Sequence, residues 1–251
     1  MRPANGRDLA HYADVARDIG EPETPFRATP LAEVQEPTGQ FLVEGLIPVR
    51  SDGATGYVFG PAKSLKSFLL ADILLSVATG TPVLGRFEVR QRGTVVAFFA
   101  EDGVAEVKRR IAAIARFRGV EIPGSLRVLT EPELRLDEPP HQRRLAACLK
   151  QQDDLALVVL EPVVRLHSGD ENQAKEVATV HRYLRGLARR LGPVVLLLAH
   201  HTSHRGEARG STDFPAFGDF NVYLKKEGGN TRVRRVENRL GPPGPTFCFG
   251  V

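Results

Sequence analysis

Apolar runs of strand length alternate along the chain with stretches in which apolar residues recur every three or four positions. The first pattern is typical of buried strands and the second of amphipathic helices. The predicted strands are 56–60, 93–100, 126–130, 155–160 and 194–199, and the predicted helices are 67–79, 104–119, 142–151 and 172–191. Because the long strands are apolar throughout and helices separate them, we expect an α/β core with a mostly parallel sheet and helices on both faces.

The pattern changes beyond residue 219, where shorter strand-like runs replace the long apolar ones. These runs are 220–226, 231–237 and 246–251, and Glu227-Gly228-Gly229-Asn230 between the first two is typical of a hairpin turn. The sequence therefore predicts that antiparallel strands near the C-terminus extend the parallel core.

The first 40 residues differ from the rest because they are polar and are punctuated by prolines. We interpret residues 1–40 as a polar N-terminal arm, partly disordered, with one short helix around 9–18. Residues 41–48 are apolar enough to form a packed entry segment, so the folded domain is expected to cover 41–251.

Composition limits the class of protein more than its function. The chain has 251 residues, enough for one α/β domain, and a net charge of +4 that suits either a polyanionic partner or an arginine-rich solvated surface. Two isolated cysteines, Cys148 and Cys248, argue against a disulfide framework and a cysteine zinc site, and suit a cytoplasmic location. The longest apolar stretch, 193–199, is too short to cross a bilayer, so no membrane contact is expected.

The segment after the first predicted strand carries a phosphate-loop pattern with one substitution. The pattern G-x-x-x-x-G-K-[ST] fits Gly60-Pro61-Ala62-Lys63-Ser64-Leu65-Lys66-Ser67, followed by Phe68, if Leu65 replaces the second glycine. Backbone N–H groups of such a loop cradle phosphates, Lys66 would reach the terminal phosphates, and the Ser67 hydroxyl would bind Mg²⁺. Leu65 is the difficulty, because the glycine that it replaces can adopt a positive φ angle.

Acidic residues follow two further strands of the predicted sheet. Glu101 and Asp102 come after the second long strand, and Glu161 comes directly after the third. We assign Glu101 mainly to positioning a water molecule and Asp102 mainly to capping the next helix. An acid after an apolar strand is the Walker B pattern, so Glu161 is a candidate ligand of Mg²⁺.

Two histidines, His200 and His201, follow the fourth long strand, where a polar side chain can sense the terminal phosphate. A zinc site with His204 is a weaker interpretation, because these histidines lack cysteine partners or a pair along one helix face.

Together these segments resemble the RecA-like ATPases with a P-loop core. The segments are Gly60–Ser67, Glu101-Asp102, Leu160-Glu161-Pro162, Gly169-Asp170-Glu171-Asn172, His200-His201-Thr202 and Arg209-Gly210-Ser211. Within that group the chain is most similar to the RepA-type hexameric helicases of plasmids and their AAA-type relatives in bacteria and phages, over residues 41–251.

The resemblance implies a role for each matching residue. Lys66 and Ser67 would be the Walker A residues, Glu101 the catalytic glutamate and Glu161 the Walker B acid. One of the two histidines would sense phosphate, and sequence alone does not distinguish them. Arg209 and Arg239 are candidates for an arginine that reaches the neighbouring subunit's nucleotide, since Glu237-Asn238-Arg239-Leu240-Gly241 resembles a finger-bearing segment of the relatives.

The same resemblance implies ATP and Mg²⁺ as cofactors, a homo-oligomeric ring, as a hexamer, and single-stranded DNA as the partner. Candidate DNA loops are 165–172 and 204–209, and Arg232, Arg234 and Arg235 form a further basic patch. Three departures from the family pattern, Leu65, Glu161 and Glu237, favour slow hydrolysis or binding without turnover. The alternatives to a helicase or translocase are therefore a nucleotide-dependent DNA-binding module and a recombination or repair ATPase.

Overall fold

The computed structural model describes residues 28–34, 40–130, 133–202, 213–227 and 230–250. The chain divides into two compact units, Met1–Glu36 and Pro37–Val251. In the first unit the described part contains the short 3₁₀ helix η1 (Leu31–Glu33). The helix predicted around 9–18 lies outside the described residues.

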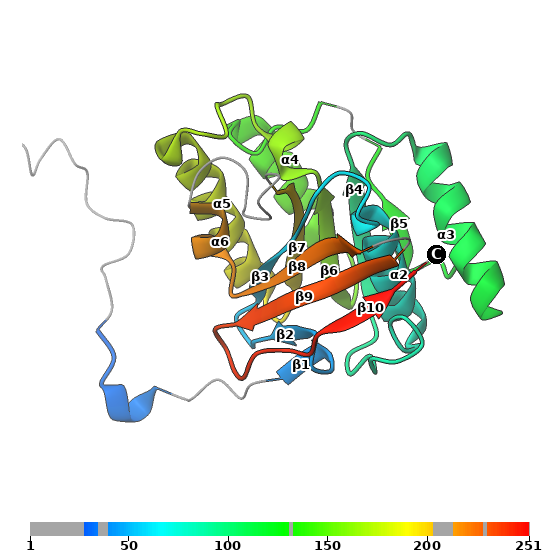
Figure 1. The fold of residues 1–251 in the computed structure, drawn as a ribbon. Coiled ribbons are helices and arrows are strands. Elements are labelled where there is room, and N and C mark those ends of the chain that lie inside the picture. Colours follow the sequence, from blue (N-terminus) through cyan, green and yellow to red (C-terminus); the bar gives the residue numbers. More distant parts are fainter. Residues whose placement is uncertain (1–27, 35–39, 131–132, 203–212, 228–229, 251) are drawn as a thin grey trace, which may run out of the picture. The chain divides into compact units, whose positions relative to one another are not determined.

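An eight-stranded sheet forms the second unit (Figure 1). Its strands are β3 (Ala54–Gly60), β4 (Thr94–Phe99), β5 (Leu126–Val128), β6 (Leu155–Glu161), β7 (Val195–His201), β8 (Phe220–Glu227), β9 (Asn230–Asn238) and β10 (Phe247–Phe249). They lie in the order β10-β9-β8-β3-β7-β6-β4-β5. The six strands from β8 to β5 in this order pair in parallel, whereas β9 and β10 are antiparallel to their neighbours. The predicted parallel core and its antiparallel extension are both confirmed.

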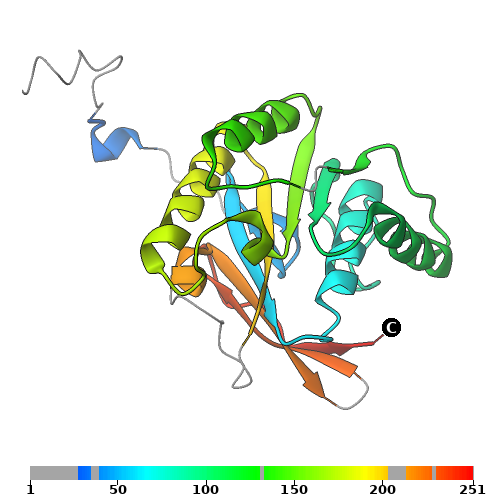
Figure 2. The same cartoon turned by 90° about the horizontal axis from the view of Figure 1, so that it is seen from above.

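Helices cover both faces of this sheet (Figure 2). The helices α2 (Lys66–Thr79) and α3 (Val104–Arg118) pack on one face. The other face carries α4 (Pro139–Lys150), α5 (Ala174–Leu191) and the short α6 (Asp213–Phe217). Because strand residues alternate between faces, Val58 of β3 joins the first core while Tyr57 and Phe59 join the second.

Several boundaries differ from the prediction for local reasons. Residues 40–49 form a hairpin of β1 (Gln40–Val43) and β2 (Ile47–Val49), turning at Gly45, whose φ is 68°. Helix α4 begins three residues before the predicted position 142, because a proline is well tolerated in the first turn. The 3₁₀ helix η2 (Val163–Leu166) and α6 were not predicted, since each is too short to show a period.

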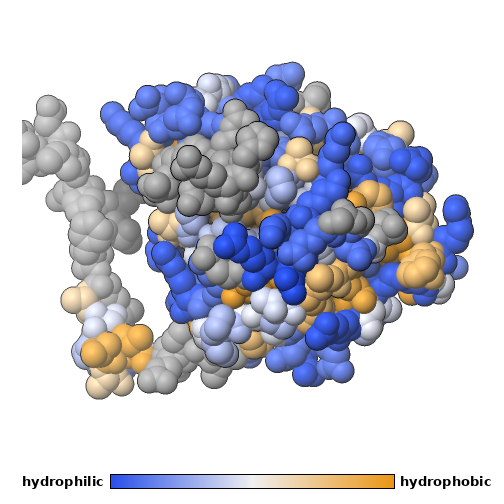
Figure 3. Space-filling view, viewed as in Figure 1, coloured by the Kyte–Doolittle hydropathy of each residue, from blue (hydrophilic) through white to orange (hydrophobic). Residues whose placement is uncertain are grey.

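The surface in the orientation of Figure 1 is largely hydrophilic, with a hydrophobic area beside β10 (Figure 3). An apolar pocket of about 450 Å³ lies between α2, α3 and the C-terminal strand, lined in part by Phe68, Phe117 and Phe249. Within the ranges that the structure describes, no helix is both long and apolar enough to cross a bilayer.

The sheet sets the position of the candidate site, because β3, β4, β6 and β7 run in the same direction and end at one edge. In the pairing register Gly60 lies beside His201 and Phe99 lies beside Glu161. Residues that lie far apart in sequence therefore meet at the carboxyl edge, which is where ligands bind in open parallel sheets.

Candidate nucleotide-binding site

The phosphate-loop segment connects the end of β3 to the first turn of α2, as its sequence pattern requires. A Cβ atom at Gly60 would lie 2.5 Å from Ser64 Oγ, so only glycine fits where the loop begins. Ser64 is buried, and its carbonyl oxygen accepts a hydrogen bond from Thr231 Oγ1 of β9 at 3.2 Å. The loop is thus fastened to the C-terminal extension as well as to β3.

Leu65 has the backbone conformation that glycine normally supplies. Its φ and ψ are 59° and 23°, in the left-handed region, and it is the N-cap residue of α2 without a side-chain capping bond. Such a conformation costs a residue with a Cβ atom about 1–2 kcal/mol. The substitution has therefore changed the energy of the loop, while the loop keeps the turn that sends its chain into α2.

Lys66 is folded back onto the loop that precedes it. Its Nζ donates hydrogen bonds to the carbonyl oxygens of Gly60 (2.8 Å) and Pro61 (2.9 Å) and lies 3.4 Å from His201 Nδ1. Burial lowers the pKa of Lys66, while the nearby charges of Glu161 and Glu101 act in the opposite direction. A cation in this position is close enough to be transferred from the loop carbonyls to a phosphate.

Ser67 and Glu161 are in direct contact. Ser67 Oγ donates a 2.7 Å hydrogen bond to Glu161 Oε1. The second carboxyl oxygen, Oε2, is buried and has no hydrogen-bond partner among the described residues. Burial raises the pKa of Glu161 to about 7, although the Ser67 hydrogen bond and the charge of Lys66 oppose this shift.

These two side chains fit Mg²⁺, although no ion is part of the structure. A hydroxyl and a carboxylate are the hard oxygen donors that this cation prefers. A divalent cation would also satisfy the orphaned Oε2 and favour the ionised carboxylate. The longer side chain of Glu161, in place of the usual aspartate, therefore still reaches Ser67.

The two histidines of β7 point to opposite faces of the sheet. His200 is 1% exposed, stacks on Phe214 with ring centroids 4.1 Å apart, and packs against Tyr57 and Phe59. His201 is partly exposed and lies beside Lys66. This alternation favours His201 as the candidate that senses phosphate, because His200 belongs to the aromatic core.

The acids after β4 are engaged by two arginines that the sequence interpretation had missed. Glu101 is half exposed, and its Oε1 lies 3.2 Å from Arg165 Nε of η2. Asp102 Oδ2 accepts a 2.7 Å hydrogen bond from Arg110 Nη1 of α3. The predicted cap is wrong, because the N-cap residue of α3 is Gly103 and no side chain caps it.

Of these two arginines, only Arg110 had a usable signal in the sequence. It lies two helical turns beyond the start of α3, and a cation there can reach back to an acid before the helix. The guanidinium of Arg110 also lies 5.2 Å from the ring centroid of Phe68, so it joins α2 to α3 beside the loop. Arg165 follows a proline in an irregular segment, where sequence spacing predicts no contact.

The arginines proposed for the neighbouring site are placed differently. Arg209 and His204 lie outside the described residues. Arg239 is exposed, and its backbone N–H donates to the carbonyl oxygen of Asp219, whose carboxylate accepts a hydrogen bond from the backbone N–H of Thr55 near the start of β3. Arg239 is therefore at the edge of the sheet opposite the phosphate loop and takes no part in its own chain's site.

Comparison with known proteins agrees with this geometry. The profile described as an AAA domain matches residues 22–207, which is most of the chain. This chain belongs to the AAA domain family. Among the curated proteins this AAA domain has no match.

Two solved structures share the fold of this AAA domain. The crystal structure of the RadB recombinase has a TM-score of 0.56 and 18% identity, covering 78% of this chain and 86% of that chain. The ATPase domain of a helicase has a TM-score of 0.56 and 14% identity, covering 98% of this chain and 95% of that chain. The expected RecA-like P-loop ATPase fold is thereby confirmed.

The left-handed conformation of Leu65 yields a first prediction. Leu65→Gly is expected to be more stable than Leu65→Ala by about 1 kcal/mol, because both lose the leucine side chain and only glycine relieves the backbone. Urea unfolding of the two variants measures the difference. At an ordinary helical position alanine would be the more stable, so an alanine variant at least as stable as the glycine variant would contradict the assignment.

Burial of Glu161 yields a second prediction, on pH. Its pKa in the folded chain is about 7, above the ordinary 4.5, so the native state holds a proton that the unfolded state releases between these values. The stability that this proton contributes is fully present below pH 4.5 and is lost as pH rises through 7. Glu161→Gln removes this dependence, so its stability relative to wild type should rise across that window by on the order of 3 kcal/mol.

Denaturant unfolding of both proteins at about pH 5, 6, 7 and 8, without nucleotide or Mg²⁺, measures this gain. The difference between the two proteins cancels the titration of every other group. A pH-independent difference would mean that Glu161 ionises normally.

Proposed function

We propose that this chain is an ATPase that assembles into a ring and moves along single-stranded DNA as a helicase or translocase. The observation that carries the proposal is the convergence of Lys66, Ser67, Glu161 and His201 at one sheet edge. Separate sequence segments supply these groups, and each has the chemistry that a nucleoside triphosphate and its cation require.

Each side chain has a distinct task in this proposal. The loop N–H groups and Lys66 bind phosphates, and Ser67 and Glu161 hold Mg²⁺, which supplies charge neutralisation when bound. Glu101 orients and deprotonates the attacking water, and its charge already acts on Lys66. His201 is placed to respond to the terminal phosphate through its contact with Lys66.

The ring is proposed from the position of Arg239. An exposed arginine at the far edge of the sheet cannot serve its own nucleotide, but it can serve a neighbour that packs against that edge. A planar guanidinium is suited to charge spread over phosphoryl oxygens. Arg209 remains the second candidate, and the hexamer rests on the resemblance to RepA-type helicases.

DNA action is proposed because the candidate loop after β6 is joined to the site. Arg165 lies on η2 at the start of this loop and contacts Glu101. A DNA phosphate that attracted Arg165 would compete with Glu101 for the guanidinium. This connection favours hydrolysis that responds to DNA.

The strongest alternative is a nucleotide-dependent DNA-binding module with little or no turnover. Two observations favour it: the strained Leu65 in the loop, and the carboxylate of Glu101 held by Arg165. A recombination or repair ATPase is a further alternative, because the RadB recombinase shares the fold.

Steady-state ATP hydrolysis with Mg²⁺, measured with and without single-stranded DNA, tests the proposal. Wild type should turn over ATP, faster with DNA, and Lys66→Ala should reduce turnover to background. Glu101→Gln should keep nucleotide binding and lose about 10²–10⁴-fold in rate, because it retains size but cannot accept a proton.

The outcomes separate the alternatives. Turnover no higher than that of Lys66→Ala would exclude the enzyme, and tight binding in the same protein would identify the regulatory module. Strand exchange without unwinding would identify a recombination ATPase.

A further inference from the structure

The outer side of α5 is unusually basic. Its buried side carries Val177, Val180, Leu184 and Leu187, whereas four arginines are exposed on the rest of the helix. These are Arg182, Arg185, Arg189 and Arg190. Amphipathic helices commonly have a charged outer side, so the charge alone identifies no ligand.

The surface is also hollow beside three of these arginines. A pocket of about 470 Å³ lies between α5 and α6, and Arg182, Arg185 and Arg189 line it. Small residues, Ala178, Gly186 and Ala216, leave the space open. No acidic side chain lines it in the described part of the chain, so the pocket presents positive charge to a ligand.

One arginine is held in place at the floor of the pocket. The guanidinium of Arg185 lies 4.9 Å from the ring centroid of Phe217, and its Nη2 donates a 2.9 Å hydrogen bond to the Phe217 carbonyl oxygen. Phe217 is fixed from within the core by His181, whose ring stacks on it at 4.0 Å. The cost of ordering Arg185 on binding is therefore partly met before a ligand arrives.

The flanking arginines lack the acidic partners seen elsewhere. Arg110 and Arg118 form short ion pairs with Asp102 and Asp72. Among the described residues, by contrast, neither Arg182 nor Arg189 forms an ion pair with a carboxylate. Their charges remain available to an external anion.

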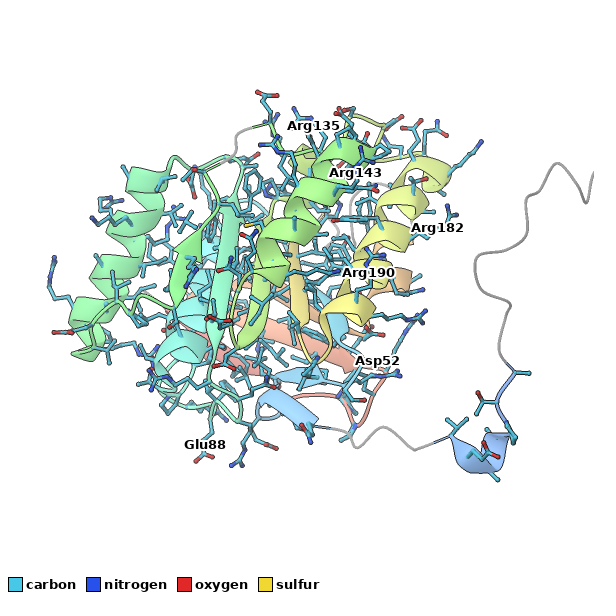
Figure 4. All side chains as sticks on the ribbon, turned by 180° about the vertical axis from the view of Figure 1, so that it is seen from behind. Asp52, Glu88, Arg135, Arg143, Arg182 and Arg190 are labelled. Atoms are coloured by element: carbon cyan, nitrogen blue, oxygen red, sulfur yellow. The ribbon has the colours of Figure 1, made fainter. Side chains whose placement is uncertain are left out.

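The basic surface is longer than the pocket. Figure 4 shows Arg182 and Arg190 on α5 and Arg143 on the neighbouring helix α4, on one side of the molecule. Arg143 and Arg190 are also exposed. A surface that spans two helices suits a polymeric anion better than a single small one.

We infer that the α5 arginines, Arg182, Arg185 and Arg189, bind the phosphodiester backbone of single-stranded nucleic acid. Seven residues separate Arg182 from Arg189, which is a rise of about 10.5 Å, or about three nucleotide steps of roughly 3.4 Å. Helix α5 begins at Ala174, directly after the candidate DNA loop 165–172, so a strand leaving that loop can continue along it. This inference rests on the proposed action on DNA.

Fluorescence anisotropy with a labelled dT30 oligonucleotide tests the inference. The triple variant Arg182→Gln, Arg185→Gln, Arg189→Gln should bind on the order of tenfold more weakly. The slope of log affinity against log salt should fall in magnitude by about 2, because three phosphate contacts are lost at about 0.7 each.

A matched control removes the same charge elsewhere. Arg92, Arg116 and Arg127 are exposed and lie away from α5, so their triple replacement by glutamine should leave the salt slope within about 0.5 of wild type. Both variants should bind a fluorescent ATP analogue as wild type does, and thermal unfolding checks their folding.

Three results would overturn the inference. The α5 variant and the control variant could lose the same affinity, which would reduce the effect to net charge. Polyglutamate of equal charge could displace dT30 as well as unlabelled dT30 does, which would indicate an acidic protein partner. Wild type could fail to bind dT30 at all, and only this last result also contradicts the proposed DNA action.

Discussion

The candidate site depends on one backbone constraint, the left-handed turn at Leu65. This turn takes the chain out of the buried strand β3 and into α2 within a few residues. It places Lys66 over the loop carbonyls and Ser67 against Glu161 of β6. A leucine there is a local conflict, and the buried Ser64 and its bond from Thr231 are part of what holds the loop in spite of it. Backbone strain that persists in this way is typical of functional sites.

The second property of the site is charge that has not been fully neutralised. Glu161 is buried with one oxygen that has no partner in the described structure, and Lys66 donates its hydrogen bonds to the neutral carbonyl groups of the loop. Both groups have pKa values shifted toward the neutral form by burial. A cation beside Glu161 and a phosphate beside Lys66 would reverse both shifts. The site is thus more complete electrostatically with a nucleotide and Mg²⁺ than without them.

Sequence was sufficient for the fold because its strongest signals are collective. The long strands are buried on both faces, so their sequences are apolar throughout and easily recognised. The carboxyl-edge residues followed from strand order alone. Single side chains were harder: whether His200 or His201 faces the loop depends on strand phase, and β7 extends past the apolar run into both histidines. Asp102 was misassigned because a distant arginine competes with the helix N-terminus for its carboxylate.

The central claim is that a phosphate loop with leucine in place of glycine still binds a nucleotide with its cation. Calorimetric titration with ATPγS and Mg²⁺ at about pH 7, in two buffers of different ionisation enthalpy, tests it most directly. The account predicts one site per chain, no binding by Lys66→Ala, and release of a fraction of a proton by wild type that Glu161→Gln does not release. Absence of binding by wild type, or equal binding by Lys66→Ala, would contradict it.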